Sequence, residues 1–294
     1  MAEGLHMSFS FSQPGGRAFV PDGSDVDVAL ARTTHLAIGA HADDVEFMAW
    51  WPIHQCASRD DLWLTAVVVA DGRGSPRSGP YAGTSDTQMR DIRFGEQCEA
   101  ARLGRYSAVL CLDHASEAIR ARPADAGARG LRAELSAVVG ACGAREIYTH
   151  SLADRHDTHA ALAVAVVDAI CALPEAQRPQ RLYGGEVWGA LDWLCESDKT
   201  VFDVSDAETL MGSLMGVFAS QLEGGKRYDL ATLGRKRANA TYLHPREVDR
   251  AAALDYALDM TPLVREPSLD PRAFVRACIQ RFQAEVEARL ERFC

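Results

Sequence analysis

The feature that most constrains the fold of this chain is a regular alternation of short apolar segments with longer amphipathic ones. Apolar runs that predict buried strands lie at 35–40, 62–72, 107–114, 146–151 and 181–190. Segments with apolar residues at helical spacing lie at 87–104, 129–143 and 159–173. Because strands that alternate with helices pair in parallel and are covered on both faces, we expect an α/β fold. The expected architecture is a Rossmann-like, doubly wound, mainly parallel sheet.

The regions before and after this alternation differ from it in character. Residues 1–30 are rich in Gly, Ser, Pro and Asp, and we expect an N-terminal arm there. Residues 31–222 form the predicted α/β domain. The alternation weakens in residues 223–294, which we expect to form a helical and mixed C-terminal extension packed on the same domain. Its last helix is predicted to be capped by Asp270 and to begin at Pro271.

Composition argues against several classes of partner. The chain carries 41 acidic and 31 basic side chains, for a net charge of −10. It has no block rich in Lys and Arg, so we expect neither a nucleic-acid partner nor binding to an anionic membrane. We expect a cytoplasmic protein, because the first residues lack a signal-peptide pattern and no apolar run reaches about 18 residues. The eight cysteines are scattered and read as free thiols, and homo-oligomerisation stays open.

The first predicted strand ends in a cluster of charge. His41, Asp43, Asp44 and Glu46 follow the strand at 35–40 directly. Acids after a strand commonly form turns, so this cluster alone does not establish a site. Sheets of the predicted kind, however, bind ligands beyond the carboxyl ends of their strands, which is where these side chains lie. The cluster is therefore a candidate metal site if a second group of ligands lies nearby.

A second polar cluster follows the predicted strand at 146–151. It contains His150, Asp154, His156, Asp157 and His159. His156 and His159 are three positions apart and share one face if a helix begins here. Two imidazoles and one carboxylate bind a divalent metal and leave positions for water and substrate. Asp43 and Asp44 are adjacent and diverge, so that one can bind the metal while the other acts as a general base.

These two motifs resemble those of the PIG-L/LmbE-like N-deacetylases, which act on glucosaminyl lipids, thiol precursors and antibiotic aminosugars. The first family motif, His-Pro-Asp-Asp-x-Glu, stands here as HADDVE at 41–46. The second, Asp-x-His-x-Asp-His, stands as DRHDTH at 154–159, and an Arg-x-x-Glu helix is echoed at 93–96. The resemblance covers about residues 33–222, including the pair Ser-Gln at 220–221.

The resemblance implies a role for each residue that matches these motifs. His41, Asp44 and His159 would bind Zn²⁺ or another divalent transition metal. Asp43 would be the general base that activates a water on the metal, and His156 the general acid or the partner of the oxyanion. The implied activity is hydrolysis of a linear amide, with acetate as one product.

Further residues are expected around this centre. The resemblance gives Arg93 to the sugar hydroxyls, and position alone suggests Asp113 as a second sugar contact. Arg155 is expected either to contact the substrate or to form an ion pair with a nearby acid. Glu46 and Asp157 are expected to support the ligands and the catalytic histidine from behind.

Two positions depart from the family motifs. Ala42 replaces the usual proline, which loosens the turn without removing a ligand. Thr158 stands where the family has an acid before the ligand histidine, and the acid sits one place earlier, at Asp157. We expect Thr158 to cap the helix that follows, and the departure puts in doubt how the pKa of His156 is tuned.

The sequence therefore predicts a zinc-dependent hydrolase that removes an N-acetyl or other N-acyl group from a small aminosugar or glycoside. Two alternatives stay open. The segment His-Ala-Asp at 41–43 with a distant histidine also matches the facial triad of non-haem iron oxygenases, although strand–helix alternation argues against their barrel fold. A catalytically silent family member that binds a sugar or a metal is the other, because of Thr158.

Overall fold

The computed structural model describes residues 9–223 and 227–294 and contains an eight-stranded mixed sheet. The strands in chain order are β1 (Arg17–Phe19), β2 (His35–Gly39), β3 (Leu64–Ala70), β4 (Ala108–His114), β5 (Glu146–His150), β6 (Arg181–Gly185), β7 (Lys199–Asp203) and β8 (Leu254–Asp259). Their order across the sheet is β1-β4-β3-β2-β5-β6-β8-β7. The five strands predicted from apolar runs are all confirmed.

The sheet is parallel in its centre and antiparallel at both edges. Strands β4, β3, β2, β5 and β6 pair in parallel, whereas β1, β8 and β7 join in antiparallel pairs. Every residue of β2 and β3 is buried, as expected for strands covered on both faces. The chain builds outwards from β2 through β3 to β4 and then returns to the other side of β2 with β5. The two polar clusters therefore follow neighbouring strands at the topological switch point, where such sheets bind ligands.

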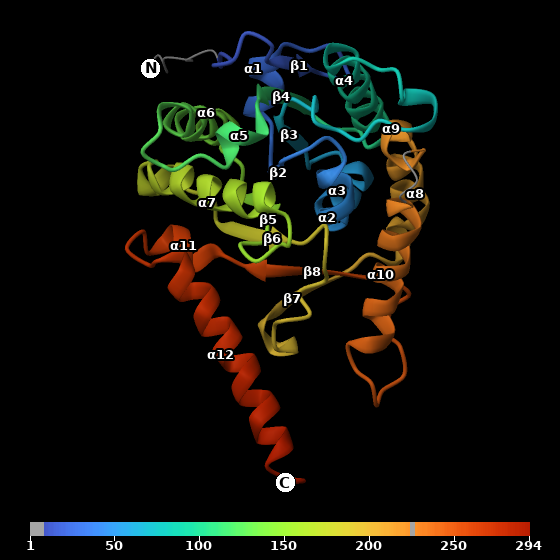
Figure 1. Cartoon of the computed structure of the whole chain (residues 1–294), viewed down its shortest axis with the longest axis vertical. Helices are drawn as coiled ribbons and strands as arrows, with labels where there is room; N and C mark the ends of the chain where they lie inside the picture. The colour runs from blue at the N-terminus through green and yellow to red at the C-terminus, as the bar shows by residue number, and fades with distance from the viewer. Residues whose placement is uncertain (1–8, 224–226) are drawn as a thin grey trace.

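Helices cover both faces of the sheet, and the α/β prediction is confirmed (Figure 1). The helices are α1 (Val26–Ala31), α2 (Asp44–Met48), α3 (Trp50–Ser58), α4 (Asp86–Leu103), α5 (Ser116–Ile119), α6 (Ala126–Cys142), α7 (Asp157–Cys171), α8 (Glu208–Gly216), α9 (Ala219–Leu222), α10 (Tyr228–Tyr242), α11 (Thr261–Arg265) and α12 (Pro271–Leu290). Helices α6 and α7 pack with one hydrophobic cluster on one face, and α2, α3 and α8 pack with a second on the other.

Three strands of the sheet, β1, β7 and β8, lie outside the five apolar runs that predicted strands. Strand β8 inserts between β6 and β7, so residues beyond 223 complete the sheet. A buried ion pair joins this strand to α10, where the Lys236 ammonium contacts one carboxylate oxygen of Asp255. The other oxygen of Asp255 accepts the backbone N–H of Trp50 at 3.1 Å, which links β8 to the start of α3.

The chain before β2 is held by a second buried polar group. Strand β1 pairs with β4 at the edge of the sheet. The Glu134 carboxylate on α6 accepts the backbone N–H of Ser12 at 2.8 Å and its hydroxyl at 2.6 Å. The His114 ring lies 2.6 Å from the same carboxylate. These bonds fix residues near the N-terminus against the α6 face.

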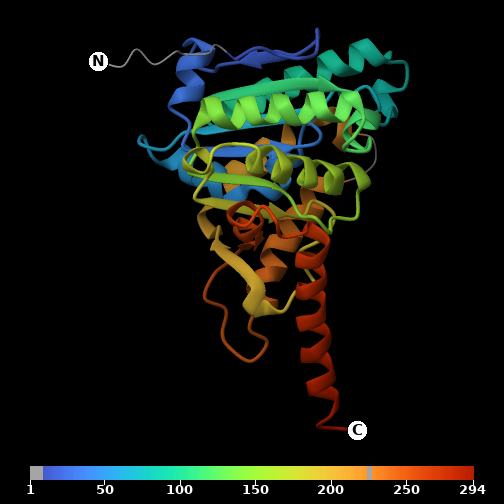
Figure 2. The ribbon, with the colours of Figure 1, turned by 90° about the vertical axis from the view of Figure 1, so that its left-hand side faces the viewer.

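The last helix, α12, extends away from the rest of the molecule (Figures 1 and 2). The side chain of Asp270 caps it by accepting the N–H of Arg272 at 3.1 Å, and Pro271 begins it, as predicted. Its apolar face is only partly covered, because Cys278 is buried whereas Ile279 and Leu290 are about half exposed. Within the described residues, no helix is long and apolar enough to cross a membrane.

Candidate metal centre and active site

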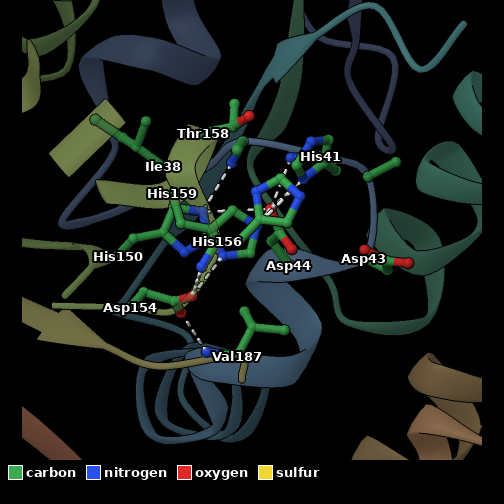
Figure 3. Close-up of polar contacts among 12 residues, drawn as sticks. Ile38, His41, Asp43, Asp44, His150, Asp154, His156, Thr158, His159 and Val187 are labelled. Carbon is green, nitrogen blue, oxygen red and sulfur yellow. Dashed lines mark hydrogen bonds and ion pairs between the residues drawn. The ribbon is translucent and has the colours of Figure 1, made fainter. Parts of the chain in front are cut away.

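The turn after β2 sends two adjacent carboxylates in opposite directions. Asp43 has a φ of 92°, a conformation that non-glycine residues rarely adopt, and α2 begins at the next residue. Gly39 permits this tight turn, since a Cβ there would lie 3.0 Å from the Asp44 side chain. Asp44 therefore faces the histidines that end or follow β5. Asp43 points away from them (Figure 3).

Three side-chain atoms from the two clusters meet at nearly equal separations. Oδ2 of Asp44 lies 3.2 Å from Nδ1 of His41 and 3.3 Å from Nε2 of His159. The two histidine nitrogens lie 3.2 Å apart. A tetrahedral zinc ion with bonds of 2.0–2.1 Å places its ligand atoms about 3.3 Å apart. The three residues predicted as ligands thus form a triangle of the size that one zinc ion requires.

A further histidine, His150, lies beneath this triangle. It ends β5, is fully buried, and stacks on His159 with ring centroids 3.9 Å apart. Its Nε2 lies 3.2 Å from the Asp44 carboxylate and accepts the backbone N–H of Ala40 at 2.9 Å. The sequence placed His150 in the second cluster but gave it no role. An Nε2 that accepts the N–H of Ala40 carries no proton to donate to Asp44, and the Nδ1 of His150 has no hydrogen-bond partner among the described residues.

The histidines and acids form two overlapping groups that are able to hold a metal ion. These are His41, His156 and His159, and Asp44, His150 and His159. Burial opposes the charged form of Asp44, but the surrounding imidazoles hold its pKa well below the usual range. Burial likewise opposes a charged His159, yet the carboxylates of Asp44 and Asp154 raise the pKa of His159 to about 10. The point between Asp44 and these histidines therefore favours a bound cation.

Asp43 lies beside this centre and is held by Arg93. Burial raises the pKa of Asp43 to about 7, although the guanidinium of Arg93 3.4 Å away opposes the rise. Arg93 is itself buried and also donates to the carbonyl of Ala42. Its side chain therefore positions Asp43. It also lines the cleft, where we predicted that Arg93 contacts a sugar.

Glu46 supports Asp43 from behind through one intermediate residue. The Glu46 carboxylate accepts the amide of Gln97 at 2.8 Å and the hydroxyl of Tyr106 at 2.9 Å. Gln97 in turn accepts the backbone N–H of Asp43 at 3.3 Å. Glu46 therefore reaches the turn that carries Asp43, and it does not contact a ligand histidine directly.

The β5 side of the site departs from the family motif as the sequence suggested. His156 is the N-cap residue of α7, and its Nδ1 is buried without a hydrogen-bond partner among the described residues. Burial and the neighbouring histidines lower the pKa of His156. The expectation that Thr158 caps the helix is wrong, because it lies buried in the first turn and accepts from Arg120 at 3.0 Å. Asp157 is exposed on that turn.

The centre opens into a cleft of about 450 Å³. Its walls include Phe47, Val187, Trp188 and Tyr228, together with α5 and the loop at 72–76. The other two predicted substrate contacts lie elsewhere. Asp113 is paired with Arg90 at 2.7 Å and lines a smaller neighbouring pocket, and Arg155 is exposed outside the lining of the cleft.

Part of the chain that carries this site matches the model of a known family. Residues 36–170 match the model of the PIG-L family, described as GlcNAc-PI de-N-acetylase, and this segment spans β2 to α7. No curated protein sequence matches the chain.

Several solved structures share the fold at 15–20% identity. The N,N′-diacetylchitobiose deacetylase of Pyrococcus horikoshii is 15% identical, with a TM-score of 0.61 over 79% of this chain and 85% of that one. The 4-carboxy-2-hydroxymuconate hydratase GalB of Pseudomonas putida is 18% identical, with a TM-score of 0.58 over 78% and 96%. The A40926 pseudoaglycone deacetylase Dbv21 is 20% identical, with a TM-score of 0.55 over 78% and 97%. The family match shows that residues 36–170 resemble the PIG-L deacetylases, and the solved structures show that the chain shares their fold.

Proposed function

We propose that this chain is a metal-dependent N-deacetylase that removes an acetyl or other acyl group from a small N-acylated aminosugar or glycoside. The observation that carries the proposal is the triangle of Asp44, His41 and His159, with a separate buried carboxylate, Asp43, beside it. A hydrolase of this kind needs both a metal centre and a base that the metal does not occupy.

The residues present fit a divalent transition metal. The donor set of two imidazoles and one carboxylate is typical of catalytic zinc, and it leaves room for a water and a substrate oxygen. Asp154 lies 3.3 Å from Nδ1 of His159, which fixes the ring so that Nε2 faces the centre. Zn²⁺ is therefore the proposed cofactor, bound by His41, Asp44 and His159.

The side chains around the centre supply the acid–base steps. When bound, the metal would acidify a water and polarise the acyl oxygen. Asp43 takes the proton from that water and returns it to the departing nitrogen, which balances the conversion of amide and water to acetate and amine. Its pKa of about 7 is well matched to both steps near neutral pH, and the positive charge of a bound metal lowers it further.

His156 has a different task in this scheme. Its lowered pKa keeps the ring neutral at pH 7, and its Nδ1 has no partner among the described residues. We assign the proton to Nε2, from where the ring donates a hydrogen bond to the oxygen that gains charge as the acyl carbon is attacked. The residue therefore stabilises an oxyanion and does not serve as the main acid.

The oxygenase alternative fits the geometry less well. That triad requires Asp43 to bind the metal together with His41, but Asp43 is turned towards Arg93 and the neighbouring Asp44 takes its place. The hydratase among the structural neighbours shows that this fold also accommodates a reaction other than deacetylation. Release of acetate is thus the decisive measurement.

The experiment is a screen of N-acetylated sugars and glycosides for released acetate, using zinc-loaded protein. We expect acetate from at least one aminosugar, loss of release with a chelator, and recovery after zinc is added back. The Asp44→Asn variant serves as the control that removes one ligand, and it should stay inactive with zinc present. Activity that survives both chelation and Asp44→Asn would overturn the proposal.

A further inference from the structure

We propose that Arg120 is an anion-binding residue of the cleft, and that the aminosugar substrate carries a carboxylate or phosphate group which it recognises. The inference rests on the proposed function, because it names a property of the substrate at the same site. It comes from a motif position, Thr158, that the metal centre and the catalytic groups leave unexplained.

Arg120 lies close to the metal centre and is reachable from the cleft. It follows α5 directly and lines the cleft together with His156 and His159. Its Nη1 donates to the hydroxyl of Thr158 at 3.0 Å, and Thr158 is the residue before the proposed ligand His159. The Arg120 side chain is 39% exposed, so a bound molecule in the cleft has access to the guanidinium.

The charge of Arg120 is poorly balanced by the protein. Its acidic partner is Glu117 at 3.2 Å, whose side chain is 80% exposed, and such solvated pairs contribute little. Thr158 accepts a hydrogen bond without bringing negative charge. The other arginine of the cleft, Arg93, is instead buried against Asp43. The hydrogen bonds of Arg120 to Thr158 and Glu117 use two of its five N–H donors and leave others for a ligand.

Position 158 determines whether this guanidinium is available. Thr158 is fully buried, and its hydroxyl meets Arg120 where the family motif places an acid. A carboxylate at 158 would lie against the guanidinium and satisfy it within the protein. Threonine preserves the contact but leaves the positive charge for a partner from outside the chain. The threonine at this motif position therefore accounts for a guanidinium of Arg120 that residue 158 does not neutralise.

The chemistry of the ligand follows from the shape of the group. The planar guanidinium fork matches the paired oxygens of a carboxylate or a phosphate. The apolar surfaces of Phe47, Val187 and Trp188 line the same cleft and suit the face of a sugar ring. The inferred substrate is an acidic N-acylated aminosugar whose amide reaches the centre while its oxyanion reaches Arg120.

The test measures binding separately from turnover. N-acetylglucosamine, N-acetylglucosamine 6-phosphate and N-acetylmuramic acid are titrated by calorimetry into zinc-loaded protein carrying Asp43→Asn, so that none is consumed. We expect at least one acidic sugar to bind about tenfold more tightly than N-acetylglucosamine. The phosphate and the carboxylate arms show which oxyanion the site takes.

Three variants of the same protein identify the cause of that preference. Arg120→Gln should abolish it by removing the charge, and Thr158→Asp should abolish it by supplying an internal partner. Thr158→Val is the matched control, which loses the hydroxyl without adding charge and should keep the preference. Thermal unfolding of each variant checks that it is folded, and Arg120→Gln tests the inference even if Thr158→Asp does not fold.

The outcomes separate this inference from the proposed function. Equal binding of all three sugars, or a preference that survives Arg120→Gln, overturns the role of Arg120 even if neutral sugars release acetate. A preference for acidic sugars that depends on Arg120, in a protein that releases acetate from none of them, supports the anion site and overturns the deacetylase proposal instead.

Discussion

Two of the regions in which the protein buries charge differ in what neutralises that charge. Between α10 and β8, Lys236 contacts Asp255, whose second oxygen accepts the N–H of Trp50. One cation meets one anion there, and the group is complete. At the ends of β2 and β5, Asp44 and its histidines converge on a common point instead, and nitrogen atoms of His150 and His156 have no partner among the described residues.

This difference in neutralisation distinguishes buried charges that stabilise the fold from buried charges that are proposed to bind a metal and catalyse a reaction. A buried pair that is complete within the chain is destabilised strongly when one member is removed. A group that requires a cation from outside should depend on that cation, and its neighbouring base should affect turnover more than folding. Each experiment below tests one side of this distinction.

The largest effect is expected from Asp43→Asn. An amide cannot take the proton from water, so kcat for acetate release should fall by about 10³- to 10⁴-fold in zinc-loaded protein. Metal content should be unchanged, because Asp43 lies outside the ligand triangle. Asp206→Asn, which alters an exposed acid, is the control with normal turnover. A variant at position 43 with nearly full activity would place the base elsewhere.

Lys236→Ala should affect folding and leave the chemistry alone. Removing the ammonium leaves Asp255 buried without its cation, at a cost of about 3–5 kcal/mol in the free energy of unfolding measured with urea. Lys199→Ala is the matched control, because that ammonium lies 4.9 Å from the Tyr256 ring and should contribute about 1 kcal/mol or less. Similar losses in both variants would remove the contrast between the two regions.

Metal removal should weaken the fold and abolish turnover together. A cation present at about 100 times its dissociation constant stabilises the native state by about 3 kcal/mol, so chelation should lower the unfolding free energy by that amount. Zinc should restore it in the wild type but not in Asp44→Asn. If zinc stabilises both proteins equally, it binds outside the proposed centre.

The smallest effect is expected from Glu134→Gln, at a second buried group that is complete within the chain. Burial opposes the charged carboxylate, but the bonds from His114 and Ser12 hold the pKa of Glu134 below its usual range. The loss should be about 1.5 kcal/mol at pH 7, with normal acetate release. Because a lowered pKa stabilises the fold above the unfolded value of about 4.3, the advantage of the wild type should shrink as the pH falls below it. An advantage that grows in acid would contradict this account.

The centre of the sheet could be predicted from the sequence because each of its strands is a short apolar run that can be recognised locally. Strands β2 to β6 are apolar runs, and their register brings the two motifs together at neighbouring strand ends. Strands β7 and β8 were missed because Lys199 begins the first of them and Asp255 lies inside the second. The partner that permits a buried acid in β8, Lys236, lies 19 residues away and could not be identified from periodicity.

The candidate site was predictable to a similar extent. The triangle of proposed ligands could be predicted from the two motifs, since each supplies residues that the sheet places side by side. The contact of Arg93 with Asp43 spans 50 positions, and that of Arg120 with Thr158 spans 38. Both depend on where α4 and α5 pack against the sheet. For the same reason, Asp113 was expected to face the substrate, whereas Arg90 pairs with it.

The backbone of Asp43 has a consequence for anyone who evolves this protein in the laboratory. Its φ of 92° costs on the order of 1–3 kcal/mol in a residue with a Cβ, and glycine adopts such angles freely. Glycine at position 43 would relieve this strain, but it would also leave Arg93 buried without its carboxylate partner, so selection for heat resistance acts on two opposing effects there. Screening for turnover in every round is the safeguard, because heat resistance alone does not select for the proposed general base.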